Sequence, residues 1–497
     1  MNKYDVIVIG SGLGGLECGY IMAKRGYRVC VLEQGSQTGG CLQTFKRGKT
    51  LFDTGFHFIG GLDETQFLYR LFRYYDLHDL PWHRLDDHAF AEVIIDDKQF
   101  LLASGYERYA ERLARYFPHQ RKELFQFTNY LRTIANSVEG TFDTDKEREA
   151  GTSSYFDHSA YEYLTKTFSD PLLIDVLSAT SLTMELYPEQ TPLYVFAQTN
   201  NSFLRSAWRI KGGGSLISDR LIENIRRMGG EVMTKAKVTR LIESEGKINR
   251  VEVNGQEMME ADYVISNIHP TSTLNLIPES TMVRKVFRNR ITKLQNTFGM
   301  FTTHLKLKPQ AVPYLNRSIF YYTEPGVWHA NLKPNPTPKS ILINYQYPTD
   351  GSIYTDNIDI LTPMHWEEVA KWEHTTVGKR GEDYKEFKAK RAEQCIELAM
   401  RCVPELRGNI EQVYTSTPLT YRDYTGTHQG TAYGIRKDYN NILMTVLTPQ
   451  TPIPNLYFTG QNLNMHGILG VSTSAFITCA KIVGLEPLLQ DIEQSKI

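Results

Sequence analysis

The sequence contains few cysteines and almost no net charge. Its 497 residues include 6 cysteines, none of them in a CxxC pair or at a spacing with histidine that is typical of a metal site. No metal is therefore expected, and the cysteines are interpreted as reduced thiols of a cytoplasmic protein. The 55 lysines and arginines nearly balance the 56 aspartates and glutamates, so the overall charge provides no attractive field for nucleic acid.

Long hydrophobic runs are also missing. No segment approaches the roughly 18 consecutive apolar residues that a membrane-spanning helix needs. The first residues, MNKYDVIVIG, are typical of a buried strand rather than of a signal peptide, so no leader is expected. The chain has 41% hydrophobic residues, 11% aromatic residues and 36 glycines, a composition that is typical of a globular protein with more than one domain.

The first cluster of glycines lies near the N-terminus. Residues 6–9 (VIVI) form the β-branched run expected of a strand buried on both faces, and Gly10, Gly12 and Gly15 follow it as GxGxxG. A helical pattern and a second strand come next, and Glu33 closes that strand. This order predicts a dinucleotide site, in which the helix N-terminus receives the diphosphate and Glu33 binds the ribose hydroxyls. The acid disfavours NADP, whereas NAD and FAD both stay open.

A second pair of glycines follows Glu33 within the sequence QGSQTGGCLQTF. NAD enzymes of the simple Rossmann type do not need this pair. With it, the sequence resembles the flavoprotein superfamily of amine oxidases and phytoene desaturases, whose N-terminal signature is GxGxxG, an acid and then paired glycines along the FAD. The resemblance implies FAD as the cofactor, with contacts from Gly10, Gly12, Leu13, Gly14, Gly15, Glu33, Gln34, Gly39 and Gly40.

Two later blocks extend the resemblance. Residues 209–267 contain a glycine-rich entry, a helical pattern and a predicted hairpin at Asn254–Gly255. In the family this block returns to the FAD domain, which implies that Val238 meets the adenine side. Residues 452–484 predict a strand, a glycine-rich connection and a helix from Ser472, whose N-terminus would stabilise negative charge on the flavin. Here the resemblance implies contacts from Gly460, Gln461, Gly470 and Val471.

Because these blocks lie at the start, in the middle and near the end of the chain, the predicted cofactor domain is discontinuous. The expected fold class is α/β, with a Rossmann-type FAD-binding domain, an α+β substrate domain and a helical lid. The expected FAD-binding parts are residues 1–80, 206–285 and 446–497. The expected substrate domain has a helical part at 81–205 and a sheet with a helix at 286–445.

Three helical or irregular segments lie outside these blocks. A lid helix is expected over 118–138, where apolar residues recur at steps of three and four. Residues 139–153 are polar and irregular, which predicts a mobile surface loop. A helix predicted over 384–403 is basic, and such a helix lies either on an anionic membrane or in solvent, so peripheral membrane contact is one of two expectations. Its basic residues are Lys385, Lys388, Lys390 and Arg391.

The substrate side is suggested by residues 51–61, LFDTGFHFIGG. This segment resembles the equivalent one of the retinol saturases and carotenoid isomerases, which carry Asp, Gly, His and Gly in the order of Asp53, Gly55, His57 and Gly60. His57 is either a proton donor at the flavin or a histidine that holds the loop. Residues 417–435 resemble the loop before the last flavin motif of saturase-like members, and Tyr421 and Tyr433 are expected to line the pocket as further candidates for catalysis.

The resemblance implies an FAD-dependent oxidoreductase that adds or removes hydrogen across a carbon–carbon bond of an apolar isoprenoid such as a retinoid or carotenoid. Saturation, desaturation and isomerisation all stay open. No second dinucleotide motif for NAD(P)H is present, so the electron donor or acceptor is not identified. The alternatives are a flavin amine oxidase and a non-catalytic prenyl or lipid binder of the GDP-dissociation inhibitor type, which shares the fold without FAD.

Overall fold

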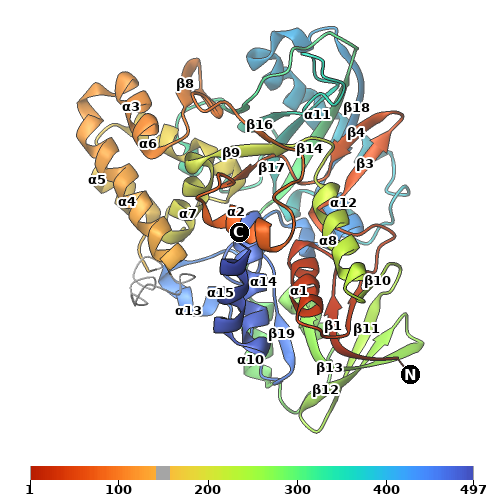
Figure 1. The fold of residues 1–497 in the computed structure, drawn as a ribbon. Helices are drawn as coiled ribbons and strands as arrows, with labels where there is room; N and C mark the ends of the chain where they lie inside the picture. The colour runs from red at the N-terminus through yellow and green to blue at the C-terminus, as the bar shows by residue number, and fades with distance from the viewer. Residues whose placement is uncertain (1, 141–156, 496–497) are drawn as a thin grey trace.

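A computed structural model describes residues 2–140 and 157–495 and arranges them around two large β-sheets (Figure 1). The first sheet lies beside the N-terminus and is mainly parallel in its centre. Its strand order is β10-β2-β1-β13-β12-β11, with β19 parallel to β13. These strands are β1 (Asn2–Ile9), β2 (Val29–Leu32), β10 (Glu231–Met233), β11 (Val238–Ser244), β12 (Lys247–Val253), β13 (Glu257–Ser266) and β19 (Leu456–Phe458).

The first sheet joins the three sequence blocks that were predicted to bind FAD. β1 pairs in parallel with β2 on one side and with β13 on the other, and β19 extends the sheet past β13. The hairpin at Asn254–Gly255 is confirmed, because β12 and β13 are antiparallel and Asn254 and Gly255 have φ angles of 55° and 70°. A Rossmann-type sheet is thus assembled from discontinuous segments.

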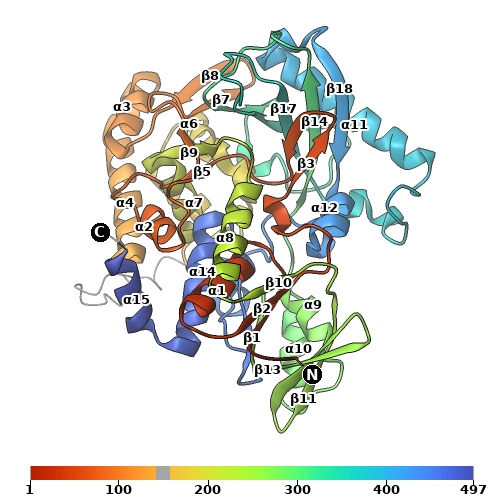
Figure 2. The same cartoon turned by 45° about the vertical axis from the view of Figure 1, so that its right-hand side comes forward.

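Helices cover both faces of this sheet, because β1 is apolar on both sides. Val6 and Val8 pack with α1 (Leu13–Lys24), α8 (Ser215–Arg227) and α14 (Gly467–Val483), which lie together on one side (Figure 2). Ile7 and Ile9 belong to the core on the other side, with α9 (Pro270–Asn275) and α10 (Lys285–Thr292). The β-branched run therefore forms the doubly covered strand that the sequence predicts.

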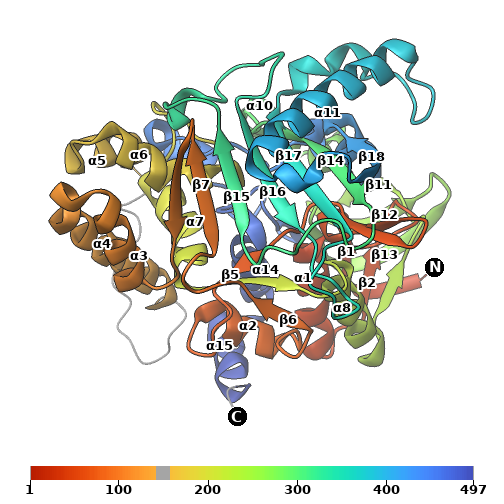
Figure 3. The ribbon, with the colours of Figure 1, turned by 90° about the horizontal axis from the view of Figure 1, so that it is seen from above.

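The second sheet has the strand order β18-β14-β17-β16-β15-β7-β8 (Figure 3). Its strands are β7 (Ala91–Ile95), β8 (Lys98–Leu102), β14 (Gly299–Leu307), β15 (Ser318–Tyr322), β16 (Ser340–Tyr345), β17 (Asn357–Met364) and β18 (Ile410–Ser416). α11 (Glu382–Cys402) packs on one face, against Phe301, Ile343 and Ile360. The opposite face, with Met300, Leu342 and Leu361, turns toward the helical layer.

That helical layer consists of α3 (Tyr106–Tyr116), α4 (Arg121–Gly140), α5 (Ala160–Thr167), α6 (Pro171–Ser178) and α7 (Leu193–Arg205). The predicted lid helix corresponds to α4, which packs against α3 and α7 with Leu124, Phe127 and Leu131 buried in the shared core. Its movement as a lid stays a prediction. Most of the predicted mobile loop, residues 141–153, lies outside the described residues.

The remaining elements connect these layers. They are β3 (Thr44–Arg47), β4 (Thr50–Asp53), β5 (Ile59–Gly60), β6 (Trp82–Arg84), β9 (Ala207–Ile210), α2 (Phe67–Tyr74), α12 (Pro418–Thr425), α13 (Ile442–Thr445) and α15 (Leu485–Gln494). None of the helices in residues 2–140 and 157–495 combines the length and the apolarity that crossing a bilayer requires.

Two sequence-based predictions need correction. α14 starts at Gly467 rather than at Ser472, and Gly470 lies in its first turns, where a β-carbon would lie 2.6 Å from the Met465 carbonyl oxygen. In the basic helix, Arg391 is not exposed, since its guanidinium is buried in an ion pair with Glu368. Fewer basic residues therefore face solvent than the sequence indicates.

Candidate active site

One cavity of about 400 Å³ lies between the two sheets and touches all three sequence blocks. It runs from the glycine loop after β1 to the face of the second sheet that carries Met300, Leu342 and Leu361. Most of the predicted site residues line it: Gly10, Gly12, Leu13, Gly14, Glu33, Gln34, Gly39, Gly40, His57, Val238, Tyr421, Tyr433, Gly460, Gln461 and Val471. The structure thus brings the cofactor and substrate candidates into a single space.

The three blocks meet at Gly14. A β-carbon placed there would lie 2.8 Å from Asn267 Oδ1, 3.1 Å from Val471 Cγ1 and 3.2 Å from Gly460 Cα. Only a residue without a side chain leaves this contact intact. The N-terminus of α1 therefore opens into the cavity with backbone amides that no side chain caps, as diphosphate binding requires.

Gly15 and Gly470 are the two predicted site residues that do not line this cavity. A β-carbon at Gly15 would lie only 2.0 Å from the Gly10 carbonyl oxygen, so Gly15 allows α1 to pack closely on the loop after β1. Gly470, in α14, has the same role: it allows the helix to pack closely on Met465, which precedes the helix. Both glycines thus shape the wall of the cavity from behind.

Glu33 is held rigidly at the end of β2. Its Oε2 accepts hydrogen bonds from the Ser11 amide (3.1 Å) and hydroxyl (2.6 Å), and its Oε1 accepts from the Gly35 amide (2.7 Å). The carboxylate also lines the cavity, with Gln34 and Val238 in the same wall. A ribose with two free hydroxyls fits this acceptor, whereas a 2′-phosphate would be repelled by it.

The other end of the cavity is apolar. Its wall carries Phe58, Phe203, Met300, Leu342 and Leu361. Among the described residues that line the cavity, Glu33 is the one acidic residue and Lys237 is the one lysine. Both lie on the cofactor side, with Val238. The apolar end thus carries neither an acid nor a lysine or arginine from the described chain.

His57 lies between the two ends. Burial lowers the pKa of its imidazole from the usual 6.5 to about 4, and nearby Asp359 opposes this shift. Its Nδ1 lies 3.9 Å from Asp359 Oδ2, and its buried Nε2 has no hydrogen-bond partner among the described residues. A histidine that only held the loop would use both nitrogens in hydrogen bonds, so this geometry favours a role toward a bound molecule.

Tyr421 and Tyr433 line the cavity as predicted, but the protein uses both hydroxyls. The Tyr421 hydroxyl donates to the Thr54 carbonyl (3.1 Å) and shares a hydrogen bond with the Thr302 hydroxyl (2.8 Å). The Tyr433 hydroxyl donates to the Leu182 carbonyl (2.5 Å). Burial raises the pKa of both phenols. These contacts fit residues that shape the pocket better than proton donors.

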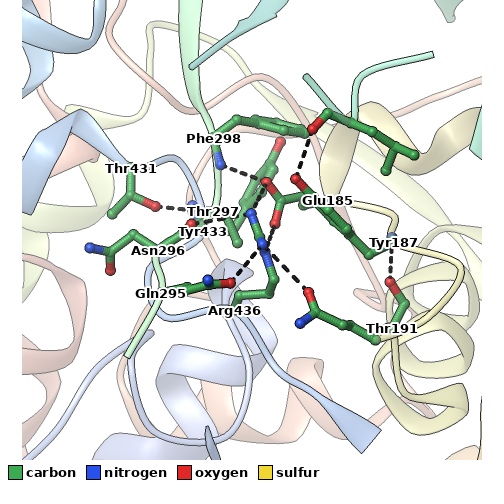
Figure 4. A network of polar contacts seen from close by, with 12 residues as sticks. Glu185, Tyr187, Thr191, Gln295, Asn296, Thr297, Phe298, Thr431, Tyr433 and Arg436 are labelled. Atoms are coloured by element: carbon green, nitrogen blue, oxygen red, sulfur yellow. Dashed lines mark hydrogen bonds and ion pairs between the residues drawn. The ribbon is translucent and has the colours of Figure 1, made fainter. Parts of the chain in front are cut away.

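The loop that carries Tyr433 is anchored by a buried ion pair (Figure 4). Glu185 accepts from Arg436 Nε (2.5 Å) and Nη2 (3.1 Å) and from the Phe298 amide (2.8 Å). These bonds tie the segment after α6 to the start of β14 and to the loop before α13. The position of the Tyr433 ring therefore depends on residues far away in the sequence.

Sequence reasoning missed several wall residues. Asn267 follows β13 and borders the glycine loop, and its position directly after the run DYVIS was a usable signal. Leu361 lies on β17, a strand that was not predicted although its first four residues, NIDI, alternate polar and apolar residues. His466 was passed over within a predicted flavin motif; its Nε2 lies 3.0 Å from the Thr183 carbonyl oxygen.

The fold and the cavity define a dinucleotide-dependent flavoprotein. A bare helix N-terminus, a fixed ribose acceptor, paired glycines and a second helix N-terminus, that of α14, lie along one cavity. The profile described as flavin containing amine oxidoreductase matches residues 13–483, and the chain belongs to this family. The protein is thus a flavin-dependent oxidoreductase, and the residues of the cavity fit FAD.

Two relatives and one solved structure specify the similarity. The chain is 28% identical to the all-trans-retinol 13,14-reductase of Rattus norvegicus over 99% of its length and 87% of that protein. It is 23% identical to prolycopene isomerase 2, chloroplastic, of an Oncidium hybrid cultivar over 98% of its length and 84% of that protein. An oxidoreductase structure from Methanosarcina mazei superposes with a TM-score of 0.62 at 16% identity, covering 95% and 98% of the two chains.

Proposed function

We propose that this protein is an FAD-dependent reductase of carbon–carbon double bonds in an apolar polyene of the retinoid or carotenoid type. The observation that carries the proposal is the apolar end of the cavity, which continues from the cofactor end without an acid or a lysine or arginine from the described residues. An amine substrate is protonated at neutral pH and would leave its charge unpaired in such a pocket. A conjugated hydrocarbon carries no charge, so its burial in this pocket leaves no charge unpaired.

Two similarities support this choice of substrate and direction. The rat relative is named as a reductase of all-trans-retinol, and the Oncidium relative as an isomerase of prolycopene. Both names describe long polyenes, although they differ in the net reaction. The reductase matches at higher identity, so reduction is our proposal, with isomerisation and desaturation as the competing outcomes.

The side chains would hold FAD and substrate in one dry space. The α1 N-terminus would bind the diphosphate, Glu33 the ribose, and the α14 N-terminus the pyrimidine edge of the flavin. When bound, FAD supplies hydride transfer, which no side chain can provide. Phe58, Phe203 and Leu361 would place the polyene and exclude water, while His57 would exchange the proton.

The direct test is an anaerobic flavin spectrum. The purified protein is reduced with dithionite, freed of excess reductant and mixed with all-trans-retinol. We expect the oxidised flavin bands to return, together with a product two hydrogens heavier than retinol. Bands that stay bleached with retinol and with lycopene would overturn the proposed reduction. Oxidation of an amine panel instead would assign the protein to the amine oxidases.

We also propose that the protein works in the cytoplasm and contacts membranes only peripherally, because its proposed substrates dissolve in lipid. Leu443 and Met444 of α13 are exposed by 85% and 44%, and Lys385 and Lys390 of α11 are exposed as well. Sedimentation with vesicles of anionic phospholipid tests this contact. Protein that stays in the supernatant at low salt would contradict it.

A further inference from the structure

A row of buried polar residues borders the apolar end of the cavity. On β14, Met300, Thr302 and His304 share one face, and Met300 lines the cavity. In the register between β14 and β17, Thr302 pairs with Leu361 and His304 pairs with Asp359. The same face of the sheet therefore changes from apolar to polar within two residues on each strand.

Asp359 and His304 form a tight pair in this row. His304 Nδ1 lies 2.7 Å from Asp359 Oδ1, and His304 Nε2 lies 3.2 Å from the Ser416 hydroxyl. Both side chains are buried, and the Phe45 and Phe52 rings meet His304 edge-on. Burying a carboxylate in such surroundings is costly, so a polar pair here calls for a role beyond packing.

The second oxygen of Asp359 faces His57. The distance of 3.9 Å from His57 Nδ1 to Asp359 Oδ2 is within ion-pair range, and an approach by about 1 Å gives a hydrogen bond. His57 Nε2 is the atom without a partner among the described residues, and His57 lines the cavity. The three side chains come from the loop after β4, from β14 and from β17, so only the tertiary structure brings them together.

We infer that Asp359 and His304 are positioning residues for His57. Asp359 holds the imidazole with its Nδ1–H toward the carboxylate and stabilises the protonated ring, and His304 fixes Asp359 in that orientation. Nε2 is then the atom that exchanges a proton with the substrate. The chemical part of this inference rests on the proposed function, whereas the orientation of His57 does not.

The proton transfer can be written in full. The Nε2–H bond of the imidazolium breaks and leaves its electron pair on nitrogen. The electron pair of the substrate double bond forms the new C–H bond at one carbon. The neighbouring carbon would take a hydride, which FAD reduced by dithionite would supply in the assay, and the neutral imidazole regains its proton from solvent.

The charges around His57 determine how readily it is protonated. Burial lowers its pKa to about 4, Asp359 raises that pKa, and His304 and Arg209 lower it. Asp53 interacts with the same Asp359 carboxylate: burial, and after it repulsion by Asp359, raises the pKa of Asp53 to about 7. Asp359→Asn removes the one named group that favours the imidazolium, so the pKa of His57 falls further in this variant.

The experiment compares Asp359→Asn with matched variants of β14. His304→Asn keeps a side-chain amide that can donate a hydrogen bond to Asp359, whereas His304→Leu removes every donor at this position. Thr303→Val is the control, because Thr303 is a buried residue of the same strand whose side chain lies on the opposite face of the sheet. The wild type and the four variants are labelled with ¹⁵N-histidine, and the His57 signals are assigned by their loss in His57→Gln. Flavin absorbance per chain and the melting temperature verify that each variant is folded.

The first readout is the tautomer of His57 at pH 7, which needs no substrate. We expect the Nδ1–H form in the wild type, in Thr303→Val and in His304→Asn, and a shift toward the Nε2–H form in Asp359→Asn and His304→Leu. The second readout is the rate of flavin reoxidation by retinol at pH 7. For Asp359→Asn we expect a fall in kcat of about 10- to 100-fold with KM nearly unchanged, as general acid catalysis predicts.

An unchanged tautomer in folded Asp359→Asn would overturn the inference, and so would an equal loss of rate in His304→Asn and His304→Leu. If the tautomer shifts as expected while the wild type does not turn over retinol or lycopene, the positioning of His57 stands and the proposed function fails. The two failures are therefore distinguishable.

Discussion

The two ends of the cavity are lined by different parts of the chain, backbone at the cofactor end and side chains at the substrate end. At the cofactor end, the wall is mostly backbone: Gly10, Gly12 and Gly14 expose amides, and Glu33 contributes the single carboxylate among the described lining residues. At the substrate end, the wall is made of large side chains from separate strands, such as Met300 and Leu361. A backbone site needs glycines at fixed spacing, whereas a side-chain site needs only apolar residues that happen to converge.

Because of this difference, a substitution has a different effect at each end of the cavity. A substitution at the cofactor end interferes with the chain path itself, because there is no space for a β-carbon. A substitution at the substrate end alters the shape or polarity of a pocket whose backbone stays in place. Binding of FAD and binding of the polyene are therefore expected to respond separately to mutation.

The largest effect is expected for Gly15→Val at the cofactor end. Its β-carbon would lie 2.0 Å from the Gly10 carbonyl oxygen, so either α1 moves away from β1 or the protein fails to fold. We expect purified protein without flavin absorbance, or a loss of stability of more than about 3 kcal/mol. Gly48→Asn is the matched control, because Gly48 has open space around it and asparagine tolerates its φ of 61°. A yellow, stable Gly15→Val protein would contradict the assignment of this packing contact.

The next effect is expected for Leu361→Gln at the substrate end. The buried amide would lack partners in an apolar wall, so we expect the KM for retinol to rise about 10-fold, which corresponds to about 1.4 kcal/mol, while FAD content stays normal. Steady-state kinetics and flavin absorbance measure both. Ile360→Val is the control, since Ile360 packs on the α11 face of the same strand. Equal effects of both substitutions would show that the strand, not the pocket wall, is affected.

A smaller effect is expected from pH through the buried carboxyl of Asp53, which ends β4 and accepts a hydrogen bond from the Gly214 amide. Burial raises the pKa of this carboxyl from 3.8 to about 7, ahead of the opposing hydrogen bond from the Gly214 amide. An acid with a raised folded-state pKa stabilises the fold fully below its unfolded pKa and loses that contribution as pH rises through about 7. We expect the melting temperature to fall between about pH 4 and pH 7, and Asp53→Asn to reduce that fall. A pH dependence identical in both proteins would exclude Asp53 as its source.

The smallest effect is expected for Tyr433→Phe. Its hydroxyl donates to the Leu182 carbonyl, so its removal costs about 1 kcal/mol of stability, seen as a melting temperature lower by a few degrees. The turnover rate should stay within a few-fold of the wild type. A fall in kcat of more than about 100-fold would instead make Tyr433 a proton donor, as first considered from the sequence.

Much of the cofactor end was predictable because its determinants are local. The spacing of Gly10, Gly12 and Gly15, and the acid at Glu33, report a strand, a turn and a helix that lie within one short segment. The hairpin at Asn254–Gly255 was predictable for the same reason. The start of α14 was misjudged because a glycine that permits close packing looks the same in sequence as a glycine in a loop.

The sequence by itself determined the family, the cofactor type and the strands of the first sheet, because short-range backbone chemistry encodes them. Only the tertiary structure decided which side chains face the cavity and which lie behind it. It placed Asp359 beside His57, buried Arg391, and committed the Tyr421 hydroxyl to Thr302 and Thr54. The physical reason is that strand register and sheet order bring together residues whose separation along the chain carries no local signal.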